Sequence, residues 1–374
     1  MKAMLNRESL AHSFNAAAAV VPTRGTKDVL KYVKLQIDGQ DATLMATDME
    51  LGVRIELDGV QCEVPGAVLL PVARFGSLLR ESTDDQLTIE STESGVAVRG
   101  ERFEVVFLSI DAAEFPEVPR FERTAYHEVS AKTLRDLLHR TAFAADQENA
   151  RYALGGVLIQ MEGECITAVG TDGRRLAKMQ GKAQPFGDHS TEGQSPVVPI
   201  RTVTILERAT SDLDGDVQIA VDENEVLIRA GRMVFFSRLI SGRFPNWETV
   251  MPKRRAEGRI TLPVAPAYSA LRQAAIVATK DSRGIDFEFH EGSLRLTANA
   301  ADAGESRVEL PVTYNGPKLS LRLDHQYVSD FLRVLEPERT FALEAENAEQ
   351  PVLFSVDDGY DYVVMPLARP QGQS

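Results

Sequence analysis

The stretch V-L-I-Q-M-E-G-E-C-I-T-A-V-G-T-D, Val157–Asp172, alternates apolar and polar residues on both sides of a central glycine. Such alternation is typical of half-buried strands, and Gly163 stands where a hairpin turn favours a residue with positive φ. The same pattern recurs in V-K-L-Q-I-D-G-Q-D-A-T-L-M-A-T-D from Val33 and in I-D-F-E-F-H-E-G-S-L-R-L-T-A-N-A from Ile285. Three copies of one hairpin, spaced by about a third of the chain, predict a threefold internal repeat.

Around each hairpin the same elements return. An amphipathic helix is expected before it and a second helix after it, followed by another hairpin. The expected helices span residues 5–21, 71–82, 129–145, 199–210, 262–279 and 324–335. Two strand sets and two helices per copy need a common core, so the pattern predicts an α+β fold of three similar helix-and-antiparallel-sheet domains.

The length of 374 residues is too great for one ordinary core and suits three domains. We expect domain 1 over residues 1–127, domain 2 over 128–256 and domain 3 over 257–374. The Pro-rich or charged stretches 117–127 and 251–258 are the predicted linkers. The polar stretch 181–195 is expected to be a mobile loop within domain 2.

Composition narrows the class of protein. The hydrophobic share of 43% and charged share of 26% are those of a globular protein. Neither a membrane-length apolar run nor a signal peptide is expected, which favours the cytoplasm. The two cysteines, Cys62 and Cys165, are too few for a disulfide framework or a four-cysteine zinc site. The net charge of −14 argues against coating DNA by bulk positive charge, but leaves room for a local basic strip.

Basic residues gather on several of the predicted helices. They are Arg74, Arg80, Lys132, Arg135, His139, Arg140, Arg201 and Arg208. Long cationic side chains on helices can attract phosphates without reading bases, as non-specific DNA binding requires. The alternative, that these are only solvated helix faces, stays open for any single residue.

Three further motifs carry a family resemblance. G-T-D-G-R-R-L-A (Gly170–Ala177), S-R-L-I-S-G-R-F-P (Ser237–Pro245) and Y-V-V-M-P-L (Tyr362–Leu367) resemble the bacterial beta sliding clamps of DNA polymerase III, and the likeness runs from Met1 to Ala368. The resemblance implies the DNA clamp fold and a head-to-tail homodimer, in which six similar domains form a closed ring around duplex DNA. It implies a processivity factor for DNA replication with no catalytic residues, no cofactor and no metal.

The resemblance also implies two sets of binding residues. The DNA-contact set consists of Arg24, Arg74, Lys132, Arg135, Arg140, Arg151, Tyr152, Arg201 and Arg283, although Ala153 stands where the family often has a second Tyr. A pocket between domains 2 and 3 is expected to take short linear motifs of partner proteins. Its residues are Leu154, Thr171, Gly173, Arg174, Arg175, Leu176, Pro245, Val250, Asp324, Tyr327, Val363, Val364, Met365, Pro366 and Leu367. Arg174, Thr249 and Ala368 depart from the family pattern, which puts the preference for acidic peptides in doubt.

The implied dimer interface joins domain 1 of one chain to domain 3 of the other. Its candidates are Val105, Phe107 and Leu108 on an edge strand and Ile276 and Val277 at a helix end. An apolar edge strand would otherwise invite uncontrolled pairing. The implied partners are duplex DNA, a second copy, the clamp loader, the polymerase alpha subunit, other polymerases and repair proteins, with no membrane.

Two other functions remain as alternatives. A metal nuclease would need several carboxylates at one site, whereas Asp48 and Asp172 occupy equivalent T-D places in different repeats. We interpret these as hairpin-end residues that bond nearby backbone. No phosphate-binding loop, H-E-x-x-H or nucleophile elbow is present. A binding scaffold without a DNA role would be indifferent to whether DNA is circular or linear.

Overall fold

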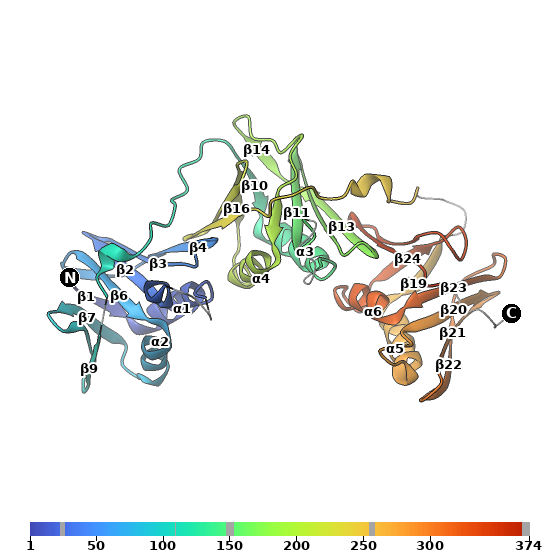
Figure 1. Ribbon diagram of the computed structural model, residues 1–374, viewed down its shortest axis with the longest axis horizontal. Helices are drawn as coiled ribbons and strands as arrows, with labels where there is room; N and C mark the ends of the chain where they lie inside the picture. Colours follow the sequence, from blue (N-terminus) through green and yellow to red (C-terminus); the bar gives the residue numbers. More distant parts are fainter. Residues whose placement is uncertain (23–26, 109, 147–152, 254–258, 369–374) are drawn as a thin grey trace. The chain divides into compact units, whose positions relative to one another are not determined.

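The computed structural model describes residues 1–22, 27–108, 110–146, 153–253 and 259–368. These residues form two compact units. Unit 1 holds Met1–Arg135, Met161–Glu164 and Ala183–Ile240, and unit 2 holds Asp136–Gln160, Cys165–Lys182 and the chain from Ser241 onward. The predicted order of helix, strands, helix and strands occurs three times along the chain (Figure 1).

The elements of the three repeats are as follows. The first repeat contains β1 (Lys2–Asn6), α1 (Arg7–Ala18), β2 (Tyr32–Asp38), β3 (Asp41–Thr47), β4 (Leu51–Leu57), β5 (Gln61–Val64), β6 (Gly66–Pro71), α2 (Val72–Glu81), β7 (Gln86–Thr92), β8 (Gly95–Arg99) and β9 (Glu104–Phe107). The second contains β10 (Tyr126–Ser130), α3 (Ala131–Ala142), β11 (Gly156–Glu162), β12 (Cys165–Thr171), β13 (Arg175–Lys182), β14 (Gln184–Phe186), β15 (Val197–Pro199), α4 (Ile200–Ala209), β16 (Asp216–Val221), β17 (Glu225–Ala230) and β18 (Met233–Arg238). The third contains β19 (Ile260–Pro263), α5 (Val264–Ala274), β20 (Gly284–His290), β21 (Ser293–Ala300), β22 (Gly304–Pro311), β23 (Leu319–Asp324), α6 (His325–Arg333), β24 (Thr340–Glu344), β25 (Val352–Val356) and β26 (Tyr360–Val364).

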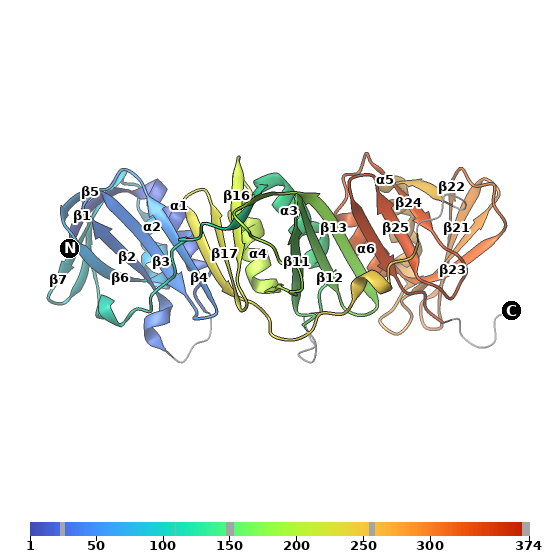
Figure 2. The same cartoon turned by 90° about the horizontal axis from the view of Figure 1, so that it is seen from above.

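Two antiparallel sheets make up most of unit 1. The order of the first is β5-β1-β7-β8-β9, and that of the second is β14-β10-β16-β17-β18-β4-β3-β2-β6 (Figure 2). Helices α1 and α2 pack against each other, with the rings of Phe14 and Phe75 4.9 Å apart. Both rings are fully buried. Burial of a large apolar side chain stabilises a fold by about 1.5–3 kcal/mol, so this contact anchors both helices.

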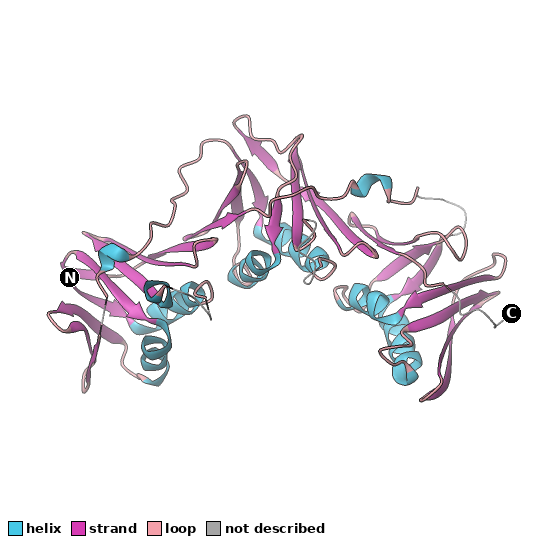
Figure 3. Cartoon of the chain, in the orientation of Figure 1, coloured by secondary structure: helices cyan, strands magenta, loops and turns pink. Residues whose placement is uncertain are grey.

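Unit 2 has the same construction. Consecutive strands of one sheet run β11-β12-β13-β26-β25-β24-β19, and a second sheet has the order β22-β21-β20-β23. Helices α5 and α6 lie side by side against these strands (Figure 3). Phe331 of α6 stacks on Tyr362 of β26 at 5.3 Å, and both side chains are fully buried.

Neighbouring repeats are joined strand to strand in one register. In unit 1, β4 of the first repeat pairs with β18 of the second, with Leu51 opposite Ser237. In unit 2, β13 of the second repeat pairs with β26 of the third, with Arg175 opposite Val364. One further backbone hydrogen bond extends the pairing at each joint. The Arg238 N–H donates to the Glu50 carbonyl at 2.8 Å, and the Met365 N–H donates to the Arg174 carbonyl at 2.9 Å.

The two T-D turns have the role that the sequence predicts. The Asp48 carboxylate accepts the backbone N–H groups of Glu50 and Leu51 at 2.9 and 2.7 Å. The Asp172 carboxylate accepts those of Arg174 and Arg175 at 2.9 and 3.0 Å. The residue after the aspartate has a left-handed backbone in both turns. It is Gly173 (φ +86°) in one turn and Met49 (φ +82°) in the other. Each aspartate therefore fixes the turn that leads into a joining strand.

The linker after the first repeat packs on the nine-stranded sheet of unit 1. Val118 is 1% exposed and Phe121 6% exposed. Arg54 donates to the Val118 carbonyl at 3.1 Å, and Arg229 donates to the Phe121 carbonyl at 2.6 Å. A Cβ on Gly52 would lie 2.9 Å from a methyl group of Val118, so glycine is needed for this close approach.

The stretch 181–195 is more structured than its composition suggests. It contains β14 and two internal anchors. Thr191 is fully buried and bonds the Met161 backbone N–H at 2.7 Å. His189 contacts His127, with Nδ1 atoms 2.6 Å apart, and accepts the Val221 N–H on Nε2 at 3.0 Å. The expectation of a mobile loop did not foresee these buried polar partners, which lie far away in the sequence.

The histidine pair defines a pH-sensitive contact. His127 is fully buried and its Nε2 lies 2.9 Å from the Gly163 carbonyl, so Nε2 carries the proton and Nδ1 accepts. His189 must accept on Nε2 and donate from Nδ1, which leaves no place for another proton. Burial, followed by the influence of His127, lowers the pKa of His189, although Asp222 opposes this shift.

We expect unit 1 to lose stability as pH falls below about 6.5, the ordinary histidine pKa. Because the folded-state pKa is lowered, the unfolded state binds more protons in this range, and the free energy of unfolding falls until the folded-state pKa is passed. Urea unfolding at pH 7.5 and at lower pH measures the effect. A His189→Ala variant should show a smaller pH dependence between the same limits, and an equal dependence would contradict the assignment.

Candidate partner site, DNA contacts and free sheet edges

The joint in unit 2 is centred on Arg175. Its guanidinium bonds the Asp330 carboxylate at 2.7 Å, the Asp172 carboxylate at 3.0 Å and the Phe143 carbonyl at 2.8 Å. It also lies 4.6 Å from the centre of the Tyr327 ring. Burial alone would lower the pKa of Arg175, but Tyr362 and the Asp330 and Asp172 carboxylates raise it above the ordinary value. Arg175 thus holds three segments of the joint together.

The polar members of the predicted peptide pocket are bonded within the protein. The Thr171 hydroxyl donates to the Arg175 carbonyl at 2.6 Å and accepts the Gly173 N–H at 3.1 Å. Asp324 is buried and caps α6 by accepting the Gln326 N–H at 2.9 Å. These groups shape the site, and their hydrogen bonds favour a structural role over contact with a peptide.

The apolar members divide into floor and surface. Leu154, Leu176, Val363 and Val364 are buried, and Leu176 pairs with Val363 across the joint. Three apolar side chains stay exposed: Val250 at 52%, Met365 at 43% and Leu367 at 37%. Gly173, Arg174 and Pro245 are also exposed.

The segment Met365–Leu367 is held in place at both ends. Met365 donates its backbone N–H to the Arg174 carbonyl at 2.9 Å, and Leu367 donates to the Arg322 carbonyl at 2.8 Å. Its side chains can therefore stay at the surface without freeing the backbone. Val250 lies outside this hydrogen-bond network and lines a groove of about 310 Å³ with Thr249, Pro351 and Leu353.

The predicted DNA-contact residues have several environments. Arg74, Lys132, Arg201 and Arg283 are exposed. Arg135 is partly buried and donates to the Thr210 and Leu213 carbonyls, the latter at 3.0 Å. Arg201 also pairs with Asp48 and donates to the Val20 carbonyl at 2.7 Å, so it links α4 to the first repeat. The predicted contacts at Arg24, Arg151 and Tyr152 lie outside the described residues.

Arg140 differs most from the prediction. Its side chain is 3% exposed and bonds the Asp358 carboxylate at 2.6 Å, with Glu336 at 3.4 Å. Burial by itself would raise the pKa of Asp358, but hydrogen bonds from Arg140 and Arg339 outweigh it and hold that pKa below its usual range. This geometry argues against DNA contact, because the guanidinium is already neutralised within unit 2.

The edge strands of the described sheets include β9 in the five-stranded sheet of unit 1 and β22 in the four-stranded sheet of unit 2. The predicted interface residues Leu108 and Ile276 are 74% and 79% exposed. Val105 and Val277 are partly exposed, whereas Phe107 is 6% exposed and packs on Phe75 at 6.1 Å. Phe107 therefore supports the edge from within its own domain.

Two negative findings concern the alternatives. Across the described ranges, no group of three or more His, Cys, Asp or Glu side chains is placed to hold a metal ion. In the same part of the chain, no helix combines the length and apolar character that crossing a membrane requires.

Comparisons with known proteins define the class first and then the family. A crystal structure of the Pseudomonas aeruginosa sliding clamp bound to griselimycin matches with a TM-score of 0.91 and 27% identity, over 99% of this chain and 100% of that one. The fold is thus that of the sliding clamps. Models of the N-terminal, central and C-terminal domains of the DNA polymerase III beta subunit match residues 1–119, 128–246 and 248–368. The chain belongs to the DNA polymerase III beta subunit family and functions as a sliding clamp.

Curated relatives agree along the whole chain. The beta sliding clamp of Pseudomonas aeruginosa is 29% identical over 97% of this chain and 98% of its own length. That of Escherichia coli K12 is 27% identical over 98% of this chain and 100% of its own length. The domain boundaries expected after residues 127 and 256 stay a prediction.

Sequence reasoning missed two exposed arginines in the third repeat, Arg272 and Arg333. Arg333 lies in the last turn of α6, as Arg80 does in α2 and Arg208 in α4, each eight residues after the first residue of its helix. Aligning the three second helices by their starts would have found it. No comparable signal exists for Arg272, because the equivalent residue of α3 is His139 and that of α1 is Asn15.

We expect Arg140→Ala to lower the free energy of unfolding by about 3 kcal/mol, since it removes one partner of a buried ion pair. Urea unfolding monitored by fluorescence measures this loss. Lys132→Ala, on the exposed face of the same helix, is the matched control and should change stability by less than about 0.5 kcal/mol. Similar small losses in both variants would contradict the structural role of Arg140.

Proposed function

We propose that two copies of this chain close into a ring around duplex DNA and tether the replicative polymerase through the site around Met365 and Leu367. One observation carries the proposal: both internal joints pair equivalent strands, and the strands that would make a third such joint are sheet edges. At each internal joint, the third strand of one repeat's first strand set (β4 or β13) pairs with the last strand of the next repeat (β18 or β26). The equivalent strands without such a partner are β22 of the third repeat and β9 of the first.

The internal joints also predict the register of the seam between copies. When the first hairpins of the first and third repeats are aligned at their turns, Arg54 of β4 takes the same position as Arg307 of β22. When the first two repeats are aligned at their closing Phe-Pro pairs, Val234 of β18 takes the same position as Val105 of β9. Arg54 is opposite Val234 at the internal joint. We therefore expect Arg307 of one copy opposite Val105 of the other, with Leu108 and Ile276 covered at the same seam.

A head-to-tail contact that repeats with a constant rotation either closes or grows without limit. Six similar domains would close into a ring if each joint turned the chain by the same angle. Closure would pair β9 of one copy with β22 of the other, two edges that are otherwise open to uncontrolled pairing. The exposed apolar side chains of Leu108 and Ile276 support a head-to-tail contact between two copies. Their burial would add to the backbone hydrogen bonds of the new strand pair.

Encirclement is consistent with the charge pattern. The chain is acidic, yet Arg74, Lys132, Arg201 and Arg283 offer exposed positive charge on or beside helices. Phosphate contacts of this kind give affinity without sequence preference, which sliding requires. The proposal includes no chemistry by this chain: a processivity subunit needs only to stay on the DNA. Its working place is the cytoplasm, where the replicated DNA lies.

Tethering is assigned to the exposed apolar side chains of Val250, Met365 and Leu367. Methionine and leucine side chains adapt to different apolar partners, while the Arg174 and Arg322 carbonyls hold the backbone of Met365 and Leu367. A partner peptide that buries one or two large apolar side chains here would gain most of its affinity from them. The clamp loader, the polymerase alpha subunit and other polymerases or repair proteins are the proposed partners.

Closure can be tested by cross-linking across the seam. In a Cys62→Ser, Cys165→Ser background, Val105→Cys with Arg307→Cys should give covalent dimers with a short bis-maleimide. The rings should then stay on nicked circular DNA in high salt and be released when the DNA is linearised. Val64→Cys with Arg307→Cys is the matched control, because β5 is the other edge of the same sheet. Equal cross-linking in both pairs, or retention after linearisation, would count against the ring.

The tether can be tested separately. Met365→Ala with Leu367→Ala should reduce polymerase stimulation on a long primed template at least about tenfold, since truncating interface anchors costs on the order of 2 kcal/mol or more. Sedimentation should still show a dimer, because the proposed seam lies elsewhere. Leu108→Ala with Ile276→Ala is the reciprocal control and should weaken the dimer. Normal product length from the folded double variant at positions 365 and 367 would show that the site is misplaced.

A further inference from the structure

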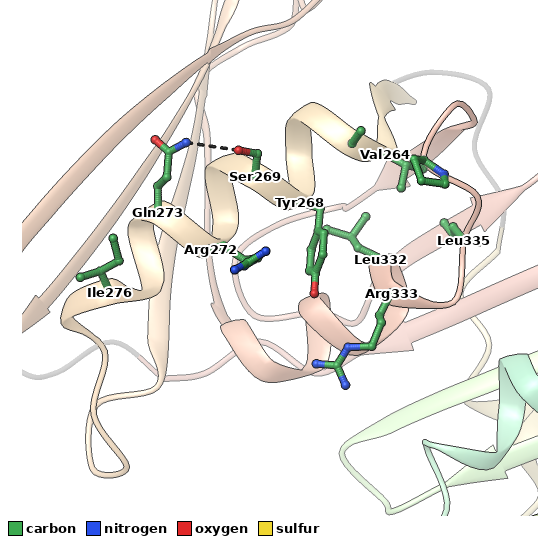
Figure 4. A pocket seen from close by; sticks show the side chains of 11 residues that line it. Val264, Tyr268, Ser269, Arg272, Gln273, Ile276, Leu332, Arg333 and Leu335 are labelled. Carbon is green, nitrogen blue, oxygen red and sulfur yellow. Dashed lines mark hydrogen bonds between the residues drawn. The ribbon is translucent and has the colours of Figure 1, made fainter.

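Unit 1 contains a cavity of about 500 Å³ that belongs to none of the sites proposed for DNA, partner peptides or the seam. It lies between the nine-stranded sheet and the linker after the first repeat, because its lining comes from β2, β3, β4, β17, β18 and residues 120–122. It differs from the groove of about 620 Å³ on α5 and α6 (Figure 4), whose lining includes Arg272, Arg333 and the seam residue Ile276.

Four arginines line the cavity, although the chain as a whole carries a net charge of −14. They are Arg54 of β4, Arg120 of the linker, Arg229 of β17 and Arg232 of the turn that follows β17. Arg232 is paired with Asp58. In the described part of the chain, the other three guanidiniums form no ion pair with a carboxylate. Three cations therefore meet at one cavity without an anion of their own.

Arg54 is the half-buried member of this group. Its hydrogen bonds leave from Nη1, to the Val118 carbonyl at 3.1 Å and to a methionine sulfur, so Nε and Nη2 have no partner among the described residues. Burial and then the charge of Arg120 lower the pKa of Arg54, and the opposing influence of Glu117 and Glu56 is smaller. A half-buried guanidinium is thus repelled by a neighbouring cation, an arrangement that a bound anion would relieve.

The sheet register places two of the arginines at one level. Arg54 lies opposite Val234 of β18, and Val234 lies opposite Arg229 of β17. Because neighbouring strands are about 4.8 Å apart, the α-carbons of the two arginines are about 10 Å apart, a span that two long side chains can close around one ion. Both arginines also donate to linker carbonyls on either side of Arg120. The linker thereby brings the third cation to the same place.

Carboxylates at the cavity limit what can enter it. The acidic lining residues are all exposed, and they are Asp38, Asp41, Glu56, Asp58 and Glu122. They would repel a long polyanion such as DNA, whose charges extend beyond the arginines. A compact anion that lies wholly among the guanidiniums avoids most of this repulsion. The charge pattern therefore favours a small ion with several oxygen atoms.

We propose that the cavity binds a compact phosphate-type oxyanion, orthophosphate or pyrophosphate, between Arg54, Arg120 and Arg229. The planar guanidinium group presents paired N–H donors that match the spacing of phosphate oxygens. The bound ion would connect β4 of the first repeat, β17 of the second and the linker, and would brace the first internal joint. The three arginines belong to none of the proposed DNA, partner or seam sets, so the inference does not depend on the proposed function.

The first test is calorimetric titration with sodium pyrophosphate, without magnesium and at constant ionic strength. Arg120→Ala should weaken binding about tenfold, because it removes a charged donor. Folding should be preserved, since Arg120 forms no hydrogen bond or ion pair with the described residues. Arg123→Ala is the matched control in the same linker: Arg123 already pairs with Asp222 and Glu225, so its loss should leave the affinity unchanged. Equal losses in both variants, or no binding by the unmodified protein, would overturn the proposal.

A second variant supplies the missing anion permanently. Arg120→Glu would place a carboxylate beside Arg54 and Arg229. It should abolish pyrophosphate binding and raise the urea midpoint in anion-free buffer, as pyrophosphate should do for the unmodified protein. A lower midpoint for the folded variant, or undiminished binding, would contradict the proposed site.

Parallel titrations distinguish the source of the oxyanion. Tighter binding of pyrophosphate than of orthophosphate would assign a ligand with two phosphoryl groups, and equal affinities would assign a single phosphate. A short DNA duplex should not compete with pyrophosphate at the same ionic strength. Full competition by the duplex that is lost in Arg120→Ala would identify a general polyanion surface and refute a site for a compact ion.

Discussion

The structure depends on strand pairing between repeats that are far apart in the sequence. The third strand of one hairpin set adds to the last strand of the next repeat, and both joints have the same register. Each joining strand is introduced by a turn in which an aspartate accepts two backbone N–H groups. A slip of one residue would turn every buried side chain of the joining strand outward, so the turn geometry protects the register.

Ion pairs reinforce these joints in different ways. At the first joint, Asp48 uses its second oxygen for Arg201 of the next repeat. At the second, Asp172 uses its second oxygen for Arg175, which then reaches Asp330 of the third repeat. Arg140 adds a buried contact with Asp358. Positive charge on an acidic chain thus serves two purposes. Arg140 and Arg175 hold domains together from largely buried positions, Arg74 and Arg283 are exposed, and Arg201 is exposed and also joins two repeats.

The sequence predicts the threefold repeat, the helix-and-sheet domains and the role of the T-D turns, because these follow from local periodicity and turn chemistry. It does not predict which arginine of α3 is buried. Lys132, Arg135 and Arg140 lie within one broad helix face, and only Asp358, more than two hundred residues away, distinguishes Arg140. Met365 and Leu367 are exposed, whereas Thr171 and Asp324 bond backbone groups two to four residues away. Turn and N-cap chemistry could have indicated these local roles from the sequence.

The linker packed on the sheet of unit 1 has a consequence for how the joints respond to dilution. Val118 and Phe121 keep the first joint tethered, so its two strands meet at a high effective concentration that does not depend on the amount of protein. The proposed seam between copies uses the same kind of strand pair with no covalent connection. Its stability must therefore vary with protein concentration. Identical backbone chemistry would then give permanent joints inside the chain and a separable one between chains.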